Sequence, residues 1–411
     1  MSADPVSVAR RLAVSGNSIR AITALHQAGF EAYIVGGAVR DLLLGTTPKD
    51  FDISTAASPE EVRQIFGRRN SRIIGKRFRL VHVYVGGELF EVSTFRKAPE
   101  NDTRQERRLR EEKELPENLI VSDNSFGTAR EDAWRRDFTI NALFYDPESG
   151  RIIDHTGLGM NDIRDRIIRA IGDPALRFEE DPVRILRALK LVGQCEGFSL
   201  DNATENALFQ QMALIRHASP SRLSLELEKI LESSRGDLHL AAFHDYGLLS
   251  YFLPEIEAAW ESETGRYMKE LLFERNCRIE EGCFRNSISL ALAAIALPFV
   301  EAELGRAPRS LWPNSPESNT AVRAVLSRIF RPQNMMLKVM MSAERILMLQ
   351  PEFEHPGRRT AQLMQQRSYG HARELMLIRR AVAGDDPERW ETEWPEIRED
   401  SRRRRSRKRK R

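Results

Sequence analysis

The most constraining feature of this 411-residue chain is one stretch, GGAVRDLLLGTTPKDFDIS, at residues 36–54. The preceding residues, EAYIV, are typical of a short strand that runs into the two glycines, and residues 38–44 are typical of a helix. Farther along, apolar residues alternate with Asp50 and Asp52, which predicts a strand that carries both carboxylates on one face. The stretch therefore predicts a strand, a tight turn, a helix and a second strand.

The same stretch has the residue types that bind a metal ion and a phosphate together. Two carboxylates on one strand face can jointly hold Mg²⁺, which prefers oxygen ligands and commonly bridges carboxylates to nucleotide phosphates. Gly36 and Gly37 let the backbone approach a ligand closely, the following helix offers N–H groups, and Arg40 is placed to reach the same anion. The third glycine of a dinucleotide fingerprint and the Gly-Lys-Ser/Thr of a Walker A loop are both missing. The residues alone leave open an ordinary turn and a chance Asp-x-Asp pair.

Two further patterns extend this α/β region toward residue 96. Residues 58–61, Ser-Pro-Glu-Glu, form a capping box that predicts a helix over 60–66. Two strand-like runs, RLVHVYV and ELFEVSTF, are separated by a Gly-Gly pair, which predicts a tight hairpin. In the register of that hairpin, His82 lies opposite Glu91.

The remainder of the chain has a different character. Residues 97–118 are almost wholly polar, which predicts a mobile insert rather than a packed element. From about Asp162 onward strand signals become sparse and helical patterns frequent, as in DPVRILRALKLVG and SRLSLELEKILESS. The chain therefore reads as an α/β head followed by a helical body.

Charge is concentrated at the C-terminal end of the sequence. The net charge is +3, but nine of the ten residues 402–411 are Lys or Arg, so the rest of the chain carries −6 (3 − 9). Such a block predicts a disordered tail that holds polyanions through counterion release, with a merely solubilising tail as the alternative. Three unpatterned cysteines and the lack of a long apolar run lead us to expect a cytoplasmic protein with no membrane insertion.

Four stretches together resemble one protein family. Residues 36–54 resemble the head of the polymerase-beta-like nucleotidyltransferases, in the class II group of bacterial poly(A) polymerases and CCA-adding tRNA nucleotidyltransferases. The later motifs of that group resemble EDAWRRDFTINALFYD (131–146), DHTGLGMNDIRDRIIRAIGD (154–173) and EEDPVRILRALK (179–190), in the same order and at similar spacing. The resemblance implies an α+β fold, with a polymerase-beta-like head built on a small mixed sheet, an all-helical body and a disordered basic tail.

The resemblance also implies a domain plan. We expect a flexible N-terminus at 1–16, the catalytic nucleotidyltransferase head at 17–153, a helical neck at 154–240 that binds RNA and the nucleotide base, a helical body at 241–398, and the tail at 399–411.

Residue roles follow from the same motifs. The resemblance implies that Asp50 and Asp52 are catalytic carboxylates that bind Mg²⁺. The nucleotide-binding residues that it implies are Gly36, Gly37, Arg40, Arg136, Asp181, Arg184 and Arg187. Among these, Asp181 and Arg184 would read the base, and Arg187 would hold phosphate. A helix through this motif would place residues 180, 184 and 187 on one face. A charged helix face that is merely exposed to solvent has the same pattern and is the alternative.

The third catalytic carboxylate has two candidates. Asp137 lies within the RRDFTINAL motif, and on that ground we favour it as the third catalytic residue. Glu91 lies on the strand expected beside Asp52, where a carboxylate could complete the metal site or activate an RNA 3′-hydroxyl.

Several features favour the poly(A) polymerase group within this family. Residues 73–96 and 123–145 resemble the polymerase versions more closely, no His-Asp phosphohydrolase pattern follows, and the arginine-rich tail is similar to those of the polymerases. The expected activity is template-independent addition of AMP from ATP to RNA 3′ ends with little sequence specificity, with RNA-decay proteins as expected partners. A CCA-adding enzyme and an inactive RNA-binding module are the alternatives.

Overall fold

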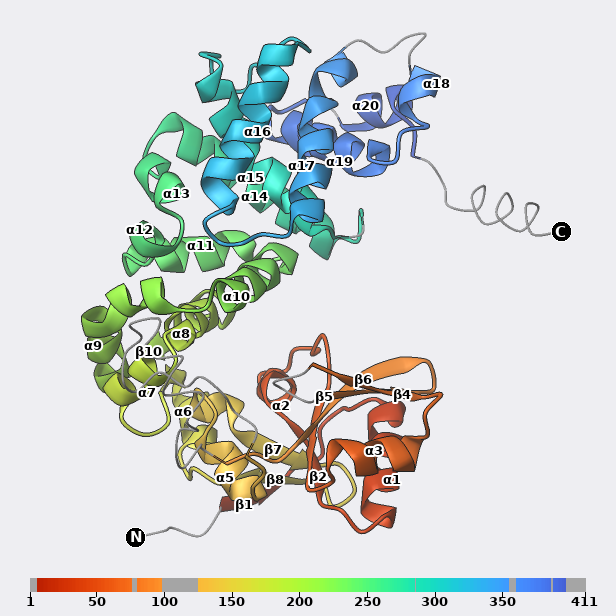
Figure 1. Ribbon diagram of the computed structural model, residues 1–411, viewed down its shortest axis with the longest axis vertical. Helices are drawn as coiled ribbons and strands as arrows, with labels where there is room; N and C mark the ends of the chain where they lie inside the picture. The colour runs from red at the N-terminus through yellow and green to blue at the C-terminus, as the bar shows by residue number, and fades with distance from the viewer. Residues whose placement is uncertain are drawn as a thin grey trace, which may run out of the picture. The chain divides into compact units, whose positions relative to one another are not determined.

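The computed structural model describes residues 6–75, 80–97, 125–284, 286–354, 360–385 and 387–396. The chain divides into two compact units, residues 1–217 and 218–411 (Figure 1). The predicted head and much of the predicted neck share the first unit, because the division falls inside the neck range of 154–240. The predicted basic tail, and the predicted insert apart from Lys97, lie outside the described residues.

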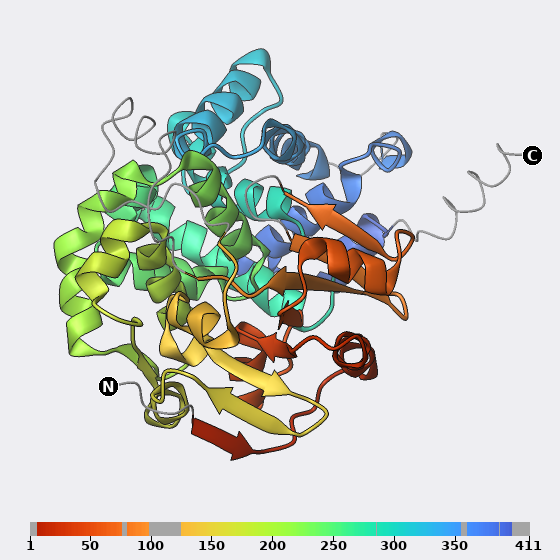
Figure 2. The same ribbon diagram turned by 60° about the horizontal axis from the view of Figure 1, so that its bottom comes forward.

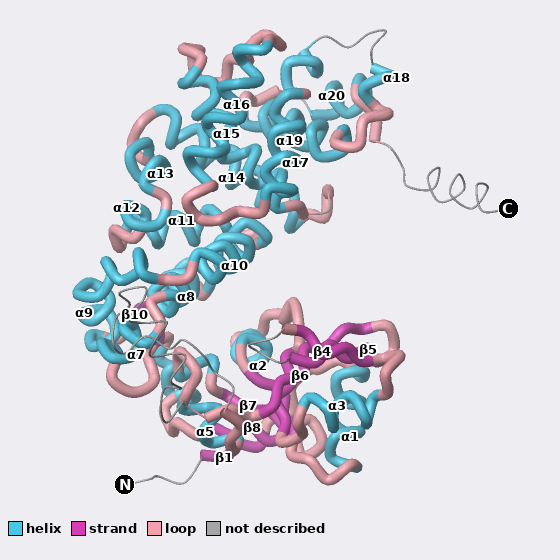
Figure 3. Tube along the Cα trace, in the orientation of Figure 1, coloured by secondary structure: helices cyan, strands magenta, loops and turns pink. Residues whose placement is uncertain are grey.

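The first unit is built on an eight-stranded sheet in the order β1-β8-β7-β2-β3-β6-β5-β4. The strands are β1 (Val6–Ala9), β2 (Ala32–Val35), β3 (Asp52–Thr55), β4 (Ser71–Ile74), β5 (Leu80–Val85), β6 (Glu88–Thr94), β7 (Leu143–Asp146) and β8 (Arg151–Asp154). Strands β3 and β6 run parallel, and the other described neighbours in this sheet are antiparallel. All described strands belong to the first unit (Figure 3), which confirms the predicted α+β class.

Helices cover both faces of this sheet. Helices α1 (Gly16–Gln27) and α3 (Pro59–Phe66) lie together on one face (Figure 1), against the fully buried Ile34 and Ile53. Helix α5 (Ala129–Trp134) packs on the other face, in a cluster that contains Val35, Phe95 and Phe144. Because side chains alternate along a strand, the residues beside Ile53 point to the face that α5 occupies.

Two elements of the head, the capped helix α3 and the β5–β6 hairpin, formed as the local sequence predicted. The Ser58 hydroxyl accepts the Glu61 N–H at 3.3 Å and the Glu61 carboxylate accepts the Ser58 N–H at 2.7 Å, so the predicted capping box is present. Gly86 and Gly87 have φ of 60° and 85°, values that a two-residue turn of this type requires. The hairpin therefore has the predicted register, and His82 pairs with Glu91.

Two predictions about the ends of elements were wrong. Residues 6–9, expected in a flexible N-terminus, form the exposed edge strand β1 beside β8 (Figure 2), because the valines of VSVA favour extended backbone and β8 offers a free edge. The strand expected to carry both acidic residues begins only at Asp52, and Asp50 lies two residues before it.

The first unit contains further helices, two of them within the head and the others after it. These are α2 (Gly37–Leu43), η1 (Thr139–Asn141), α6 (Gly159–Asp165), α7 (Pro174–Glu180), α8 (Val183–Gln194), α9 (Asn202–Gln211) and η2 (Met212–His217), with the strand pair β9 (Ile167–Ile168) and β10 (Ser199–Leu200).

The regular secondary structure in the described part of the second unit consists of helices. These are α10 (Pro220–Glu232), α11 (Gly236–Asp245), α12 (Leu249–Phe252), α13 (Pro254–Ala259), α14 (Glu263–Glu280), α15 (Ile288–Glu303), α16 (Pro316–Phe330), α17 (Leu337–Met348), η3 (Gln350–Glu354), α18 (Thr360–Leu363), α19 (Tyr369–Val382) and α20 (Pro387–Glu393). Helix α15 is buried on all sides and contacts α10, α14, α16, α17 and α19. Its apolar run therefore forms the centre of a bundle. None of the described helices has both the length and the apolar composition needed to cross a membrane.

A buried carboxyl group in α15 makes the stability of this unit pH-dependent. Glu301 is 1% exposed, and burial raises its pKa to about 7, although its carboxylate accepts the N–H of Arg309 at 2.9 Å. Because the pKa of Glu301 is higher in the folded than in the unfolded state, the contribution of this group to stability is greatest below pH 4.5 and is lost as the pH rises through about 7. Glu301→Gln should therefore increase the free energy of unfolding at pH 8 by on the order of 2 kcal/mol, and the gain should vanish near pH 4.5.

Urea unfolding followed by tryptophan fluorescence measures this effect. Four of the five tryptophans report on the second unit: Trp260, Trp312, Trp390 and Trp394. Glu303→Gln is the matched control, because Glu303 lies on the same helix with its side chain 38% exposed. An equal stability change at pH 5 and pH 8 for Glu301→Gln would contradict the assignment.

Candidate active site

A row of oxygen-bearing side chains lies where β3 and β6 run side by side. The parallel register pairs Asp52 with Glu91 and Ser54 with Ser93. Residues two apart on a strand share a face and neighbouring strands lie about 4.8 Å apart, so these four side chains are adjacent on one face. The hydroxyl oxygens of Ser54 and Ser93 are 2.9 Å apart. We use the name carboxylate row for Asp52 and Glu91 together with Asp50, which precedes β3 by two residues.

The carboxylate row is open to solvent. Asp50 and Asp52 are exposed, and the side chain of Glu91 is 52% exposed. On β5, Nε2 of His82 lies 3.4 Å from Oε1 of Glu91. An accessible set of carboxylate oxygens fits Mg²⁺, which typically takes one or two protein carboxylates together with substrate phosphates. The residues present therefore fit the ion that the sequence predicted.

A different cluster brings potential ligand atoms closer together. Within the described residues, His26, Asp146 and Glu148 form the group whose ligand atoms lie within 4.8 Å of one another. His26 Nδ1 is 2.6 Å from the Glu148 carboxylate and its Nε2 is 3.0 Å from the carbonyl oxygen of Ala32. Both ring nitrogens thus make direct hydrogen bonds, and Ala32 begins β2 at the end opposite the carboxylate row. We interpret this cluster as an ion pair that fastens α1 to the β7–β8 turn.

The two glycines stand where two arginines approach the backbone. Gly36, at φ 74°, precedes α2, and a Cβ there would lie 3.4 Å from Nη1 of Arg136. A Cβ on Gly37 would lie 3.3 Å from Nη2 of Arg40. Arg40 is 4% exposed and donates to Oδ1 of Asn141 at 2.7 Å. Arg40 therefore fastens α2 to η1 from inside the protein.

Arg136 lies on the same sheet face as the carboxylate row. Its Nη2 donates to the hydroxyl oxygen of Ser54 at 3.1 Å and to the carboxylate of Asp132 at 2.9 Å. Its guanidinium carbon lies 5.2 Å from the ring centre of Phe144. Arg136 therefore contacts Ser54, which lies two residues after Asp52 on the same face of β3.

Asp137 is held by its own segment and by α8. Its Oδ1 accepts the N–H of Phe138 at 2.8 Å, and its Oδ2 lies 3.7 Å from Nη1 of Arg187. The Asp137 side chain is 16% exposed. Asp137 thus links the RRDFTINAL segment to α8, whereas Glu91 neighbours Asp52.

We had expected one continuous helix through the motif at residues 179–190, and this expectation was wrong. Helix α7 ends at Glu180 and α8 begins at Val183, because Pro182 disfavours a helical conformation at Asp181. Asp181 and Arg184 are 6% and 7% exposed, and the Asp181 carboxylate accepts the N–H of Val183 at 3.2 Å. The two predicted base-reading residues therefore flank the break at the start of α8.

Sequence reasoning missed Arg177. Its Nη2 donates to the carbonyl oxygens of Arg135 and Arg136 at 2.6 and 2.7 Å, and its Nη1 donates to Glu180 at 2.6 Å. Its i, i+3 spacing to Glu180 was the available signal.

Positive charge is dense around Arg177. Burial, followed by the four neighbouring arginines Arg96, Arg136, Arg184 and Arg177, lowers the pKa of Arg135 to about 9. Such a region attracts anions.

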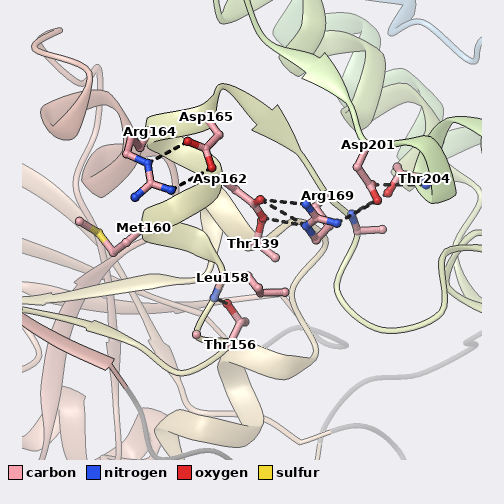
Figure 4. A network of polar contacts seen from close by, with 12 residues as sticks. Thr139, Thr156, Leu158, Met160, Asp162, Arg164, Asp165, Arg169, Asp201 and Thr204 are labelled. Carbon is pink, nitrogen blue, oxygen red and sulfur yellow. Dashed lines mark hydrogen bonds and ion pairs between the residues drawn. The ribbon is translucent and has the colours of Figure 1, made fainter.

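A second polar network fixes the segment after the RRDFTINAL motif (Figure 4). Arg169 donates through Nε to Asp162 at 3.1 Å and through Nη1 to Asp201 at 3.0 Å. Asp162 also accepts the hydroxyl of Thr139 at 2.6 Å, and Thr204 accepts the N–H of Ala170 at 3.0 Å. These bonds join η1, α6 and α9, so the elements that follow the head are held firmly to it.

Comparisons with known proteins find relatives that match large parts of this chain. Residues 32–169 match the model of the poly A polymerase head domain, and residues 197–259 match the model of the probable RNA and SrmB-binding site of polymerase A. Poly(A) polymerase I of Haemophilus influenzae is 38% identical over 258 residues, which are 63% of this chain and 56% of that protein. The CCA-adding enzyme of a Geobacillus species is 40% identical over 264 residues, which are 62% of this chain and 59% of that enzyme.

The fold agrees with these matches. The crystal structure of the Bacillus stearothermophilus CCA-adding enzyme in complex with CTP is similar with a TM-score of 0.57 and 27% identity, covering 92% of this chain and 80% of that one. The chain spans less than three fifths of the length of the two curated relatives above. It belongs to the nucleotidyltransferase family that includes the poly(A) polymerases and the CCA-adding enzymes.

Proposed function

We propose that this protein adds AMP from ATP to the 3′ ends of RNA without a template, at the carboxylate row. The observation that carries the proposal is the register of β3 against β6, which sets Glu91 beside Asp52 on an exposed sheet face. Mg²⁺ held by Asp50 and Asp52 would stabilise the charge that develops on the attacking and leaving oxygens.

The reaction is an in-line displacement at the α-phosphate of the nucleotide. The RNA 3′-hydroxyl oxygen forms a new bond to phosphorus, and the bond to the pyrophosphate oxygen breaks. We assign Glu91 to accept the hydrogen bond and then the proton of the 3′-hydroxyl, because a general base must lie within reach of that proton and Glu91 is the exposed carboxylate next to Asp52. Pyrophosphate is the leaving group.

Residues around the carboxylate row would hold the nucleotide. Arg136, beside Ser54, would contact the nucleotide, and the α2 N-terminus with Gly36 and Gly37 would offer N–H groups to phosphate. We assign base recognition to Asp181 and Arg184 at the start of α8. In the same scheme Arg187 holds phosphate, and buried Arg40 supports the glycine turn from behind.

RNA binding is assigned to two regions. The match of residues 197–259 to an RNA and SrmB-binding model supports RNA contact there, and the basic residues 402–411 would add contacts that do not depend on sequence. That model names SrmB beside RNA, which supports binding of a protein partner in this region, and RNA-decay proteins are the partner class that we propose. We propose a cytoplasmic location, supported by three cysteines that suit a reducing compartment.

CCA addition is the second candidate. It is favoured by the likeness to the Bacillus stearothermophilus enzyme over 92% of this chain. The preference for poly(A) addition is supported by the resemblance of residues 73–96 and 123–145 to the poly(A) polymerase versions of these segments, and by the basic tail.

An incorporation assay separates these functions. The purified protein is incubated with Mg²⁺ and each labelled nucleotide in turn, on a tRNA that lacks its last three nucleotides and on an unrelated RNA. We expect long products from ATP alone on both RNAs. Addition of CTP before ATP, ending after three nucleotides and confined to the tRNA, would identify a CCA-adding enzyme. No incorporation of any nucleotide would overturn the proposal.

A further inference from the structure

We infer that Arg177 and Glu180 are positioning residues that set the nucleotide preference of this enzyme, because they fix Arg184 at a defined distance from the head. This inference rests on the proposed function. Neither residue needs to touch the nucleotide for the inference to hold. Both act through Arg184 and through the backbone at residues 135–136.

Arg177 joins the two halves of the site. Its Nη2 donates to two consecutive carbonyl oxygens, those of Arg135 and Arg136, at 2.6 and 2.7 Å. The backbone that carries these carbonyls also carries the Arg136 side chain beside Ser54. Arg177 itself belongs to α7, so one guanidinium sets the separation between α7 and the RRDFTINAL segment.

Glu180 and the backbone of Arg177 hold Arg184 through one nitrogen. Nη1 of Arg184 donates to the carbonyl oxygen of Arg177 at 2.7 Å and to Oε2 of Glu180 at 3.0 Å. The same Oε2 accepts Nη1 of Arg177 at 2.6 Å. A guanidinium has five N–H donors in a fixed planar fork, so holding Nη1 also fixes the direction of its remaining donors.

Burial makes this arrangement rigid. Arg177 and Arg184 are 9% and 7% exposed, and the Glu180 side chain is 22% exposed. Lysine cannot reproduce the arrangement, because a single ammonium group on a flexible stem cannot match a planar fork that serves two carbonyls and one carboxylate. The break between α7 and α8 makes such a link necessary, because no continuous helix connects Arg177 to Arg184.

Misplacing a base-reading residue affects selection more than chemistry. A site that hydrogen-bonds one base discriminates because the wrong base leaves buried polar groups unpaired, and this discrimination depends on geometry. The carboxylate row lies on β3 and β6, and neither Arg177 nor Glu180 has a recorded contact with it. Loss of Arg177 should therefore weaken nucleotide binding and preference while the rate at saturating ATP changes little.

The test compares four single variants and one double variant in steady-state incorporation with ATP and with CTP. For Arg177→Met we expect KM for ATP to rise about tenfold, and the ratio of kcat/KM for ATP over CTP to fall about tenfold. Arg177→Lys should behave like Arg177→Met, and Glu180→Gln should lower the ratio about threefold. The matched control is Arg164→Met, because Arg164 is 70% exposed, belongs to the same unit and is paired with Asp165 (Figure 4).

The outcomes separate a positioning role from simple loss of fold. Partial unfolding lowers kcat for both nucleotides and leaves the ratio unchanged, so an unchanged ratio in folded Arg177→Lys and Glu180→Gln overturns the inference. In the double variant Arg177→Lys with Glu180→Gln, the ratio of kcat/KM for ATP over CTP should fall no further than in the more impaired single variant. The effects are not additive, because the two residues act as one unit. A wild-type protein that incorporates no nucleotide refutes the proposed function instead.

Discussion

An Asp52→Asn variant should fold normally and incorporate nucleotide about a thousandfold more slowly than the wild-type protein, since losing a metal-binding carboxylate removes about 4 kcal/mol of transition-state stabilisation. Asparagine keeps the size of the side chain and removes its charge. Asp52 is exposed at the beginning of β3, so the asparagine side chain is accommodated without repacking of the core. The effect should appear in kcat, because the lost interaction is made mainly in the transition state.

The control for Asp52→Asn is the same substitution of an exposed aspartate elsewhere in the first unit. Asp165→Asn serves, because Asp165 is exposed at the end of α6 and pairs with the adjacent Arg164. Single-turnover incorporation and circular dichroism are measured on both variants. A folded Asp52→Asn protein with more than a tenth of wild-type activity would refute the assigned site.

Glu91→Gln should lower kcat about a hundredfold, whereas Asp137→Asn should change it less than about threefold. Glu91 is half exposed and in register with Asp52, which is where a proton acceptor for the RNA 3′-hydroxyl is needed. Asp137 is directed toward Phe138 and Arg187, and an asparagine oxygen can still accept the Phe138 N–H.

These two variants decide between the carboxylates that sequence analysis left in competition. Both are isosteric, and both proteins are compared at saturating ATP with thermal unfolding as the check on fold. The reverse order of effects, a severe loss for Asp137→Asn and a mild one for Glu91→Gln, would assign the third catalytic position to Asp137. It would also require the Asp137 side chain to leave its present hydrogen bond during the reaction.

Signals that act over a few residues could be read from the sequence. The capping box at Ser58 and the Gly86–Gly87 hairpin formed as predicted, because each depends on groups within one turn. That hairpin determined the pairing of His82 with Glu91. The position of Glu91 beside Asp52 could therefore be predicted from the local hairpin signal together with the expected pairing of β3 with β6.

Features that depend on distant parts of the chain could not be read in this way. Edge strand β1 forms because β8, almost 150 residues later in sequence, presents a partner. The carbonyl contacts of Arg177 join segments about 40 residues apart, and neither segment carries a local signal for them. The contact of Asp137 with Arg187 likewise depends on α8, which brings Nη1 of Arg187 within 3.7 Å of the Asp137 carboxylate. The break at Asp181 did have a local signal, Pro182, that the helical pattern around it obscured.

The most direct test of the account asks where the divalent ion binds. Fe²⁺ is substituted for Mg²⁺, and ascorbate with peroxide then cleaves the backbone close to the bound metal. We expect fragments that end near residues 50–54 and 88–93, suppressed by excess Mg²⁺ and absent from Asp52→Asn. Cleavage confined to the neighbourhood of His26 and Glu148, or centred on Asp137, would contradict the carboxylate row as the catalytic centre.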